Sequence, residues 1–179
     1  MNIAVIIPNG FEEIEAITPI DIFRRAGLKV QTFALESNPA QGAHGIDITC
    51  DQNISSLIAV DFDLLFLPGG LPGSHTLRDH KEAQNLIKEF AQEDKYIAAI
   101  CAAPIALLEA KILNGKTVTS HPSKEKDFSD CKYSQDRVVV DGKIITSRGA
   151  GTAIEFSLRI LAELGFNDKA QTIKEAILA

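Results

Sequence analysis

Short apolar runs alternate with longer amphipathic stretches along most of the chain. Four apolar runs are typical of buried strands, and they occupy residues 3–7, 30–35, 64–67 and 96–100. Apolar side chains recur at helical spacing in residues 12–26 and 81–92, and Gly27 is placed to end the first of these helices. This alternation of strands and helices predicts a parallel sheet that is covered by helices on both faces.

The second half of the chain continues the pattern. A helix is expected at residues 102–109, directly after the strand at 96–100, and two more helices close the chain at 154–164 and 168–178. Further strands are expected at 46–50, 116–120 and 138–146, and Asp141-Gly142 predicts a hairpin turn within the last of them. Because 179 residues can bury one sizeable core, we expect a single α/β domain over residues 1–179.

Composition narrows the classes of function. The net charge is −6, and Lys and Arg form no long block, which argues against a nucleic-acid partner. No apolar run approaches the roughly 20 residues that a membrane span needs. The first residues show no secretory signal pattern, so we expect a cytoplasmic protein. The three cysteines, Cys50, Cys101 and Cys131, are odd in number and widely spaced, which does not indicate a disulfide framework.

Cys101 lies between the strand at 96–100 and the helix expected at 102–109. The N-terminus of a helix stabilises negative charge, so a thiol at this position ionises more readily. The same strand–nucleophile–helix order positions the serine of α/β hydrolases at a sharp elbow. We therefore predict a nucleophilic Cys101 whose pKa lies well below the free-thiol value of about 8.5. The alternative is a small buried hydrophobic residue without chemistry.

Three glutamates open the helix at 12–26. Glu12, Glu13 and Glu15 complement the helix dipole, which by itself explains acidic residues in a first turn. Glu15, however, lies among apolar neighbours, where a carboxylate is costly unless it has a partner. A carboxylic acid that burial keeps protonated is able to donate a hydrogen bond to a thiolate. Glu15 is therefore a candidate partner of Cys101.

Polar groups follow the other strands, at the edge where parallel sheets bind ligands. Gly69 and Gly70 end the strand at 64–67, either as a simple tight turn or as backbone N–H donors. Together with the N–H group of Ala102, they would form an oxyanion hole. His121 follows the strand at 116–120, where it is either structural or able to orient the cysteine and relay protons.

The remaining motifs indicate no cofactor. His44, His75 and His80 lack metal-ligand spacing, so we assign no metal site. Fingerprints for dinucleotide binding and for a phosphate-binding P-loop are absent. The Gly-rich residues 147–152 predict either an anion-binding helix start or a turn with Thr152 as the N-cap, and the turn is slightly favoured.

Six short motifs form a joint pattern that extends over nearly the whole chain. They are Gly10-Phe11-Glu12-Glu13-Ile14-Glu15, Arg24-Arg25-Ala26-Gly27, Leu67-Pro68-Gly69-Gly70, Ala98-Ala99-Ile100-Cys101-Ala102, Ser120-His121-Pro122 and Thr146-Ser147-Arg148-Gly149. Together they resemble the ThiJ/PfpI superfamily, and above all its deglycase branch. The resemblance implies a three-layer, flavodoxin-like α/β sandwich related to the class I glutamine amidotransferases, and a homodimer.

The resemblance also implies roles for single residues. Cys101 matches the reactive cysteine of the family, Glu15 the glutamate that hydrogen-bonds to it, and His121 the neighbouring histidine. Gly69 and Gly70 match the backbone anion site. A small-molecule carbonyl substrate and the absence of a cofactor follow from the same resemblance.

Departures from the family pattern argue against two activities, proteolysis and glutamine amidotransfer. The protease-like branch has histidine directly after the cysteine, and here this residue is Ala102. The glutamine amidotransferases have glycines at the positions of Ala99 and Ala103. The deglycase branch often has an arginine, which reaches the partner's site, in the loop near residues 43–45. This chain has none there, so the clamp for an oxyanion or carboxylate is missing unless His44 substitutes for the arginine.

Two functions from different classes remain. The first is a cysteine-dependent enzyme that acts on reactive α-oxoaldehydes or their early adducts, with Cys101 as the nucleophile, Glu15 as general acid and base, and His121 assisting. The second is a redox sensor or stress chaperone without catalysis, in which Cys101 is oxidised to the sulfinic acid. The same cysteine chemistry serves both functions, and the sequence does not separate them.

Overall fold

The computed structural model describes residues 1–179 and is built on a seven-stranded sheet with the order β10-β11-β7-β6-β1-β2-β5. All neighbouring strands are parallel except β10 and β11, which form an antiparallel hairpin at the edge. The strands are β1 (Asn2–Ile7), β2 (Lys29–Ala34), β5 (Gln52–Asn53), β6 (Leu64–Leu67), β7 (Tyr96–Ile100), β10 (Val138–Asp141) and β11 (Ile144–Ser147).

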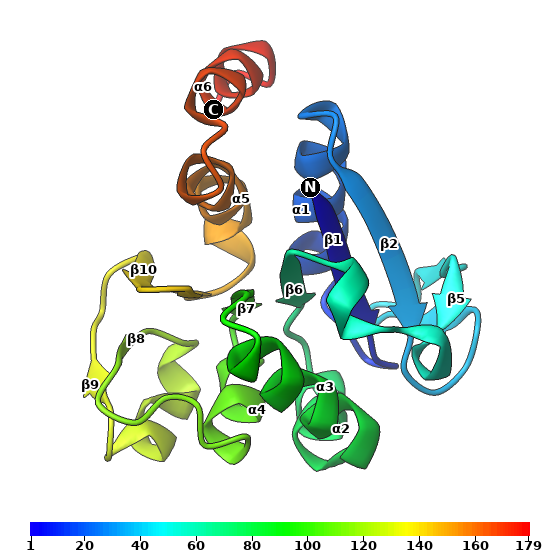
Figure 1. The fold of residues 1–179 in the computed structure, drawn as a ribbon, viewed down its shortest axis with the longest axis vertical. Helices are drawn as coiled ribbons and strands as arrows, with labels where there is room; N and C mark the ends of the chain where they lie inside the picture. Colours follow the sequence, from blue (N-terminus) through cyan, green and yellow to red (C-terminus); the bar gives the residue numbers. More distant parts are fainter.

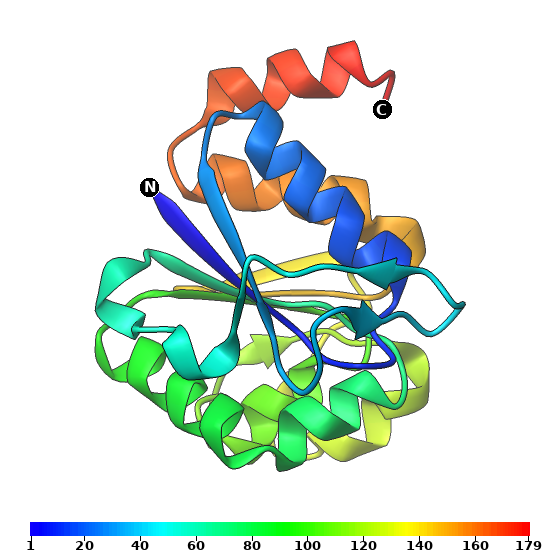
Figure 2. The ribbon, with the colours of Figure 1, turned by 90° about the vertical axis from the view of Figure 1, so that its right-hand side faces the viewer.

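Helices cover both faces of this sheet (Figures 1 and 2). One face carries α1 (Glu13–Arg25), α5 (Ala153–Glu163) and α6 (Asn167–Ala176). The other face carries α2 (Gly73–Asp79), α3 (Lys81–Gln92) and α4 (Pro104–Glu109). The predicted three-layer, flavodoxin-like α/β fold is confirmed.

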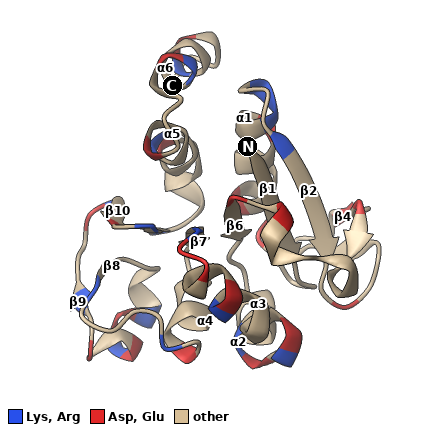
Figure 3. Cartoon of the chain, viewed as in Figure 1, with Lys and Arg blue, Asp and Glu red and all other residues tan.

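Side-chain alternation along β1 explains the two cores. Ala4 and Ile6 belong to a cluster of 26 buried residues on one face of the sheet. Ile3, Val5 and Ile7 belong to a second cluster of 25 buried residues on the opposite face. Successive side chains of a strand point to opposite faces, so a strand that is buried on both sides reads as a continuous apolar run. The central strands β1, β6 and β7 accordingly carry no charged residue (Figure 3).

Local signals in the sequence set several element boundaries. Gly27 has φ +76°, and the N–H group of Leu28 donates to the carbonyl of Phe23, which closes α1 as a Schellman-type cap. The Asp141-Gly142 turn joins β10 to β11 as predicted, with Gly142 at φ +63°. The helix ends lie within two residues of the predicted ones at α1, α3, α5 and α6.

Two predicted strands do not join the central sheet. The segment 46–50 contributes only β4 (Asp47–Ile48), which pairs with β3 (Ala40–Gln41) in a separate hairpin. The segment 116–120 contributes only β8 (Thr117–Val118), which pairs with β9 (Lys132–Tyr133). Both segments mix polar residues with apolar ones, unlike the continuous apolar runs of β6 and β7. The short helix α2 was not expected, because its seven residues offer little apolar periodicity.

None of the helices is both long enough and apolar enough to cross a membrane.

Candidate active site at Cys101

Cys101 occupies a sharp turn directly after β7. Its φ is +65°, in the left-handed region that few residues other than glycine adopt. Its N–H group donates to the carbonyl of Ser147 at 2.9 Å, and its own carbonyl accepts from the N–H group of His121 at 2.7 Å. Two neighbouring segments thus hold the strained turn in place, as expected of a nucleophile elbow.

The helix after Cys101 begins later than predicted. The first residue of α4 is Pro104, and Ala102 and Ala103 form a turn. Cys101 therefore does not occupy the helix terminus itself, and α4 is only six residues long. The apolar run at 102–109 gave no sign of this turn, because its residues suit a buried turn and a buried helix equally.

Glu15 projects from the first turn of α1 toward Cys101 and is only 1% exposed. Burial raises the pKa of its carboxyl to about 7, and the charge of Glu12 adds to the effect. A hydrogen bond with the Cys101 thiol and the N–H groups of Gly69 and Ala150 lower the pKa in part. The Oε2 atom has no partner with good hydrogen-bond geometry, which leaves the buried carboxylate under-satisfied. Near neutral pH this group is poised to take up or release a proton.

The environment of the thiol corrects one prediction. Burial raises the pKa of Cys101 to about 12, and the charge of Glu15 and the hydrogen bond to it act in the same direction. The N–H groups of Ala102 and Gly70 lower this pKa only in part. The expected low pKa is therefore wrong, because the sulfur is buried and a carboxylate lies beside it. The first proton of the Cys101–Glu15 pair leaves from Glu15, near pH 7.

The glycine loop after β6 supplies the backbone donors. Gly70 and Ala102 direct N–H groups at the sulfur, whereas the N–H group of Gly69 serves Glu15. A Cβ atom on Gly69 would contact Glu15 Oε2 and would lie 2.6 Å from Cys101 Cβ, so no larger residue fits without displacing the pair. Gly70 has φ +99°. The loop is thus a tight turn whose N–H groups face the site, but that of Gly69 is directed at Glu15 and not at the sulfur.

His121 lies at the open side of the site and is exposed to solvent. Its Nδ1 atom accepts from the N–H group of Ser123 at 3.2 Å and lies 2.8 Å from Ser123 Oγ. In the neutral ring this arrangement leaves the proton on Nε2. A Cβ built on Gly149 would lie 3.7 Å from Glu15 Oε1, 3.8 Å from His121 Cδ2 and 4.0 Å from Cys101 Sγ. The three predicted site side chains therefore gather around Gly149.

The Gly-rich segment 147–152 forms a short 3-10 turn at Ala150–Thr152 before α5. Thr152 Oγ1 accepts from the N–H group of Gly149 at 3.2 Å and lies 2.6 Å from Ser147 Oγ. Thr152 makes no side-chain cap on α5, and the N–H group of Ala150 serves the Glu15 carboxylate. The segment is thus a turn, and the N–H group of Ala150 within it is directed at the Glu15 carboxylate.

A cavity of about 380 Å³ opens above the sulfur. Its lining residues are Glu12, Ala43, His44, Gly70, Leu71, Cys101, Ala102, His121 and Ser123. The cavity brings the predicted nucleophile and histidine together with residues from the α1 and β3–β4 segments.

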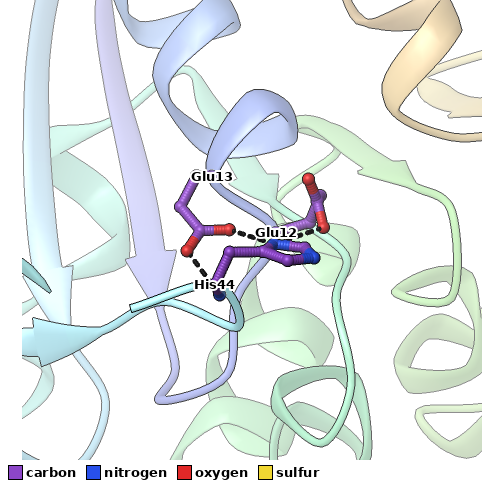
Figure 4. A group of neighbouring side chains, drawn as sticks. All are labelled: Glu12, Glu13 and His44. Atoms are coloured by element: carbon purple, nitrogen blue, oxygen red, sulfur yellow. Dashed lines mark hydrogen bonds and ion pairs between the residues drawn. The ribbon is translucent and has the colours of Figure 1, made fainter. Parts of the chain in front are cut away.

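A second cluster, Glu12, Glu13 and His44, borders this cavity (Figure 4). One ligand atom from each residue lies within 4.8 Å of the others, which is a spacing that a metal ion would accept. Both oxygens of Glu13 are already engaged, however: Oε1 accepts from the N–H groups of His44 and Ile46, and Oε2 lies 2.8 Å from His44 Nδ1. These bonds anchor the β3–β4 turn to α1. No local pattern in the sequence indicates this contact, because it joins residues 31 positions apart.

The fold and site define a class: an α/β sandwich in which a cysteine at a nucleophile elbow is paired with a buried glutamate. The family model described as "DJ-1/PfpI family" matches residues 1–163. The chain therefore belongs to the DJ-1/PfpI family, and its relatives place it in the DJ-1 branch, with a reactive cysteine.

Several relatives match almost end to end. Protein dj-1beta of Drosophila melanogaster is 38% identical over 177 residues, which are 97% of this chain and 95% of the relative. The Parkinson disease protein 7 homolog of Danio rerio is 38% identical with the same coverage of both chains. The crystal structure of Drosophila melanogaster DJ-1beta superimposes with a TM-score of 0.95 at 37% identity, covering 99% of this chain and 97% of the other.

Other relatives are longer. Protein DJ-1 homolog A of Arabidopsis thaliana is 37% identical over 181 residues, and the match covers 99% of this chain but only 46% of that protein. The chain thus spans about half the length of this relative.

Proposed function

We propose that this chain is a cytoplasmic, cysteine-dependent enzyme without a cofactor that converts α-oxoaldehydes such as methylglyoxal into 2-hydroxy acids. The observation that carries the proposal is the Cys101–Glu15 pair, which combines a partly exposed sulfur with a carboxyl of pKa about 7 beneath a cavity. A general base is most effective when its pKa lies near the working pH.

In the first step the sulfur attacks the aldehyde carbon. Ionised Glu15 takes the thiol proton as the S–C bond forms, so no free thiolate has to accumulate. The aldehyde oxygen becomes an oxyanion, which the N–H groups of Gly70 and Ala102 would stabilise. The oxyanion then takes up the proton that Glu15 carries, with His121 assisting the transfer, so the product is a hemithioacetal and Glu15 returns to its carboxylate form.

The second step is an internal redox change. Glu15 removes the proton from the former aldehyde carbon and returns it to the neighbouring carbon. The hydroxyl proton of the first carbon passes to the carbonyl oxygen of the second, which becomes a hydroxyl. The first carbon is thereby oxidised to a thioester and the second is reduced, so no external oxidant is needed. Water then cleaves the S–C bond, which releases the 2-hydroxy acid and restores the thiol.

The second candidate function is a redox sensor or stress chaperone. The N–H groups of Gly70 and Ala102, with Glu15 in its protonated form, would donate hydrogen bonds to a sulfinate on Cys101. A related structure is described as Toxoplasma gondii DJ-1, oxidized, at 32% identity and a TM-score of 0.94. A relative that is described in an oxidised form supports the proposal that Cys101 of this chain is oxidised as well.

We further propose a homodimer. Ile14 and Ile17 on α1 are 53% and 42% exposed, and Ile46 on the β3–β4 turn is 57% exposed. The bonds from Glu13 to His44 and Ile46 hold these two elements side by side. Light scattering at micromolar concentration would yield twice the chain mass of 19.4 kDa, and a mass near 19.4 kDa would contradict the proposal.

Turnover of methylglyoxal by the wild type and by Cys101→Ser tests the enzymatic function. We expect lactate from the wild type and no lactate above background from Cys101→Ser. Cys131→Ser is the matched control, because Cys131 is also partly exposed and lies outside the cavity. If all three proteins form equal amounts of lactate, catalysis does not depend on Cys101 and the proposed enzyme is excluded. If the wild type forms no lactate, the redox sensor is left as the function.

A further inference from the structure

The cavity above Cys101 contains no lysine or arginine side chain. Its ionisable lining residues, apart from the cysteine, are Glu12, His44 and His121. Glu12 is 18% exposed at the side chain, so its charge is only partly screened by solvent. The cavity wall therefore offers a carboxylate and two imidazoles to an incoming molecule, and no permanent cation.

The imidazole of His44 is already paired with acids (Figure 4). Its Nδ1 atom lies 2.8 Å from Glu13 Oε2 and 3.4 Å from Glu12 Oε2. These carboxylates raise the pKa of His44. Even when the ring is protonated, one cation faces two carboxylates, so the Glu12–Glu13–His44 side of the cavity keeps a net negative charge.

The cationic side chains that adjoin the site in the sequence point elsewhere. Lys124 follows the lining residue Ser123, but its Nζ atom lies 3.1 Å from His75 Nε2, outside the cavity. Arg148 precedes Gly149, but its guanidinium donates to the carbonyl of Gln135 at 2.9 Å. Neither side chain lines the cavity, so neither offsets this negative charge.

We infer that the cavity selects uncharged carbonyl compounds over anionic ones, with Glu12 setting the selection and His44 partly offsetting it. The inference rests on the proposed function for the class of substrate. The repulsion by Glu12 applies to any small electrophile that reaches Cys101. A carboxylate on the substrate would enter the field of Glu12 in a partly desolvated cavity, where like charges repel more strongly than in water.

Alkylation of Cys101 tests the selection without depending on turnover. Iodoacetamide and iodoacetate have nearly the same size and attack the same sulfur, but only iodoacetate is anionic. The measured quantity is the ratio of their rates at Cys101, followed by peptide mass spectrometry near pH 6, where His44 holds its proton. The two reagents differ in intrinsic reactivity, so the test uses the change in this ratio between variants.

Two variants should move the ratio in opposite directions. Glu12→Gln removes the repulsion and should lower the preference for iodoacetamide roughly fivefold. His44→Gln removes the offsetting cation and should raise the preference, while the backbone N–H groups of residues 44 and 46 still anchor the turn to Glu13. Glu89→Gln removes one negative charge from the exposed face of α3 and should leave the ratio unchanged.

The outcomes separate this inference from the proposed function. An unchanged ratio in Glu12→Gln, or a shift in the same direction in both cavity variants, would overturn the selection. A parallel assay compares phenylglyoxal with 4-carboxyphenylglyoxal, and the same opposite shifts in kcat/KM are expected. If the alkylation ratios shift as expected but neither glyoxal is converted, the charge selection stands and the enzymatic function fails.

Discussion

Glu13 and Glu15 are two residues apart in the first turn of α1, yet their surroundings drive their acidity in opposite directions. Both are buried, at 6% and 1% exposure. Burial opposes ionisation at Glu13, but hydrogen bonds from the His44 side chain and from backbone N–H groups outweigh it and lower its pKa to about 2. At Glu15 burial prevails and raises the pKa to about 7. Deeper burial and fewer hydrogen-bond donors at Glu15 together separate the reactive carboxylate from the structural one.

The two regions also differ in what they contribute to the fold. The Glu13 side fixes the β3–β4 turn and is fully hydrogen-bonded. On the Glu15 side, an oxygen without a partner lies beside a cysteine in the left-handed region. Strain and incomplete hydrogen bonding concentrate on the side that faces the cavity, which is typical of a functional site.

The largest expected effect is on activity. Glu15→Leu removes the base and should lower kcat/KM for methylglyoxal by about 100-fold or more. Glu15→Gln keeps a hydrogen-bond donor but also lacks a base, so its kcat/KM should fall as well. Glu13→Gln should reduce kcat/KM far less, because Glu13 does not contact the sulfur. Circular dichroism would verify that each variant is folded. A Leu variant as active as the wild type would show that Glu15 is not the acid and base.

The stability of the two sides should respond to pH with opposite sign. The folded-state pKa of Glu15 is raised above its unfolded value, so its ionisation destabilises the fold as pH rises from about 4.5 to about 7. Relative to the wild type, Glu15→Gln should therefore gain about 3 kcal/mol of unfolding free energy between pH 4 and pH 8.

Glu13 should show the reverse. Its pKa is depressed, so its stabilisation is present above about pH 4.5 and is lost as pH falls toward 2. Glu13→Gln should be destabilised relative to the wild type at pH 6, and the difference should shrink at pH 3. Urea unfolding over this range measures both variants, and parallel pH curves for the two would contradict the comparison.

Each carboxylate packs against a glycine, which permits a smaller, local test. A Cβ on Gly69 would contact Glu15 Oε2 and lie 2.6 Å from Cys101 Cβ, and one on Gly42 would contact Glu13 Oε1 and lie 2.7 Å from the Ile46 carbonyl. We expect each alanine variant to lose roughly 1–3 kcal/mol of stability. Only Gly69→Ala should also slow alkylation of Cys101. Gly151→Ala is the control, because its Cβ would meet nothing within 4 Å.

The smallest expected effect is the order of oxidation. Mild peroxide should convert Cys101 to the sulfinic acid severalfold faster than the other two cysteines, because ionised Glu15 takes up the thiol proton even though burial raises the pKa of Cys101 to about 12. Cys50 is buried and burial raises its pKa to about 11, whereas burial and Asp130 raise that of the half-buried Cys131. Peptide mass spectrometry after graded peroxide gives the order, and Cys131 reacting first would contradict it.

The sequence predicted those features that depend on local pattern. The strand before Cys101 and the β10–β11 hairpin follow from apolar periodicity and turn residues. The burial of Glu15 does not, because its apolar neighbours Ile14 and Ile17 are 53% and 42% exposed. The late start of α4 did not, since apolar residues fill a buried turn as readily as a helix. The bonds between Glu13 and His44 and the pairing of β8 with β9 depend on tertiary contacts between distant residues. The acidity of Cys101 was misjudged for the same reason, because it depends on the packing of α1 against the elbow.

The pH dependence of Cys101 alkylation tests the central claim, that Cys101 and Glu15 titrate as one pair. The measurement uses iodoacetamide and peptide mass spectrometry on the wild type and on Glu15→Gln. In the wild type the rate should rise with an inflection near pH 7, where Glu15 loses its proton, and Glu15→Gln should lack this inflection. The same inflection in both proteins, at the free-thiol value of about 8.5, would contradict the account.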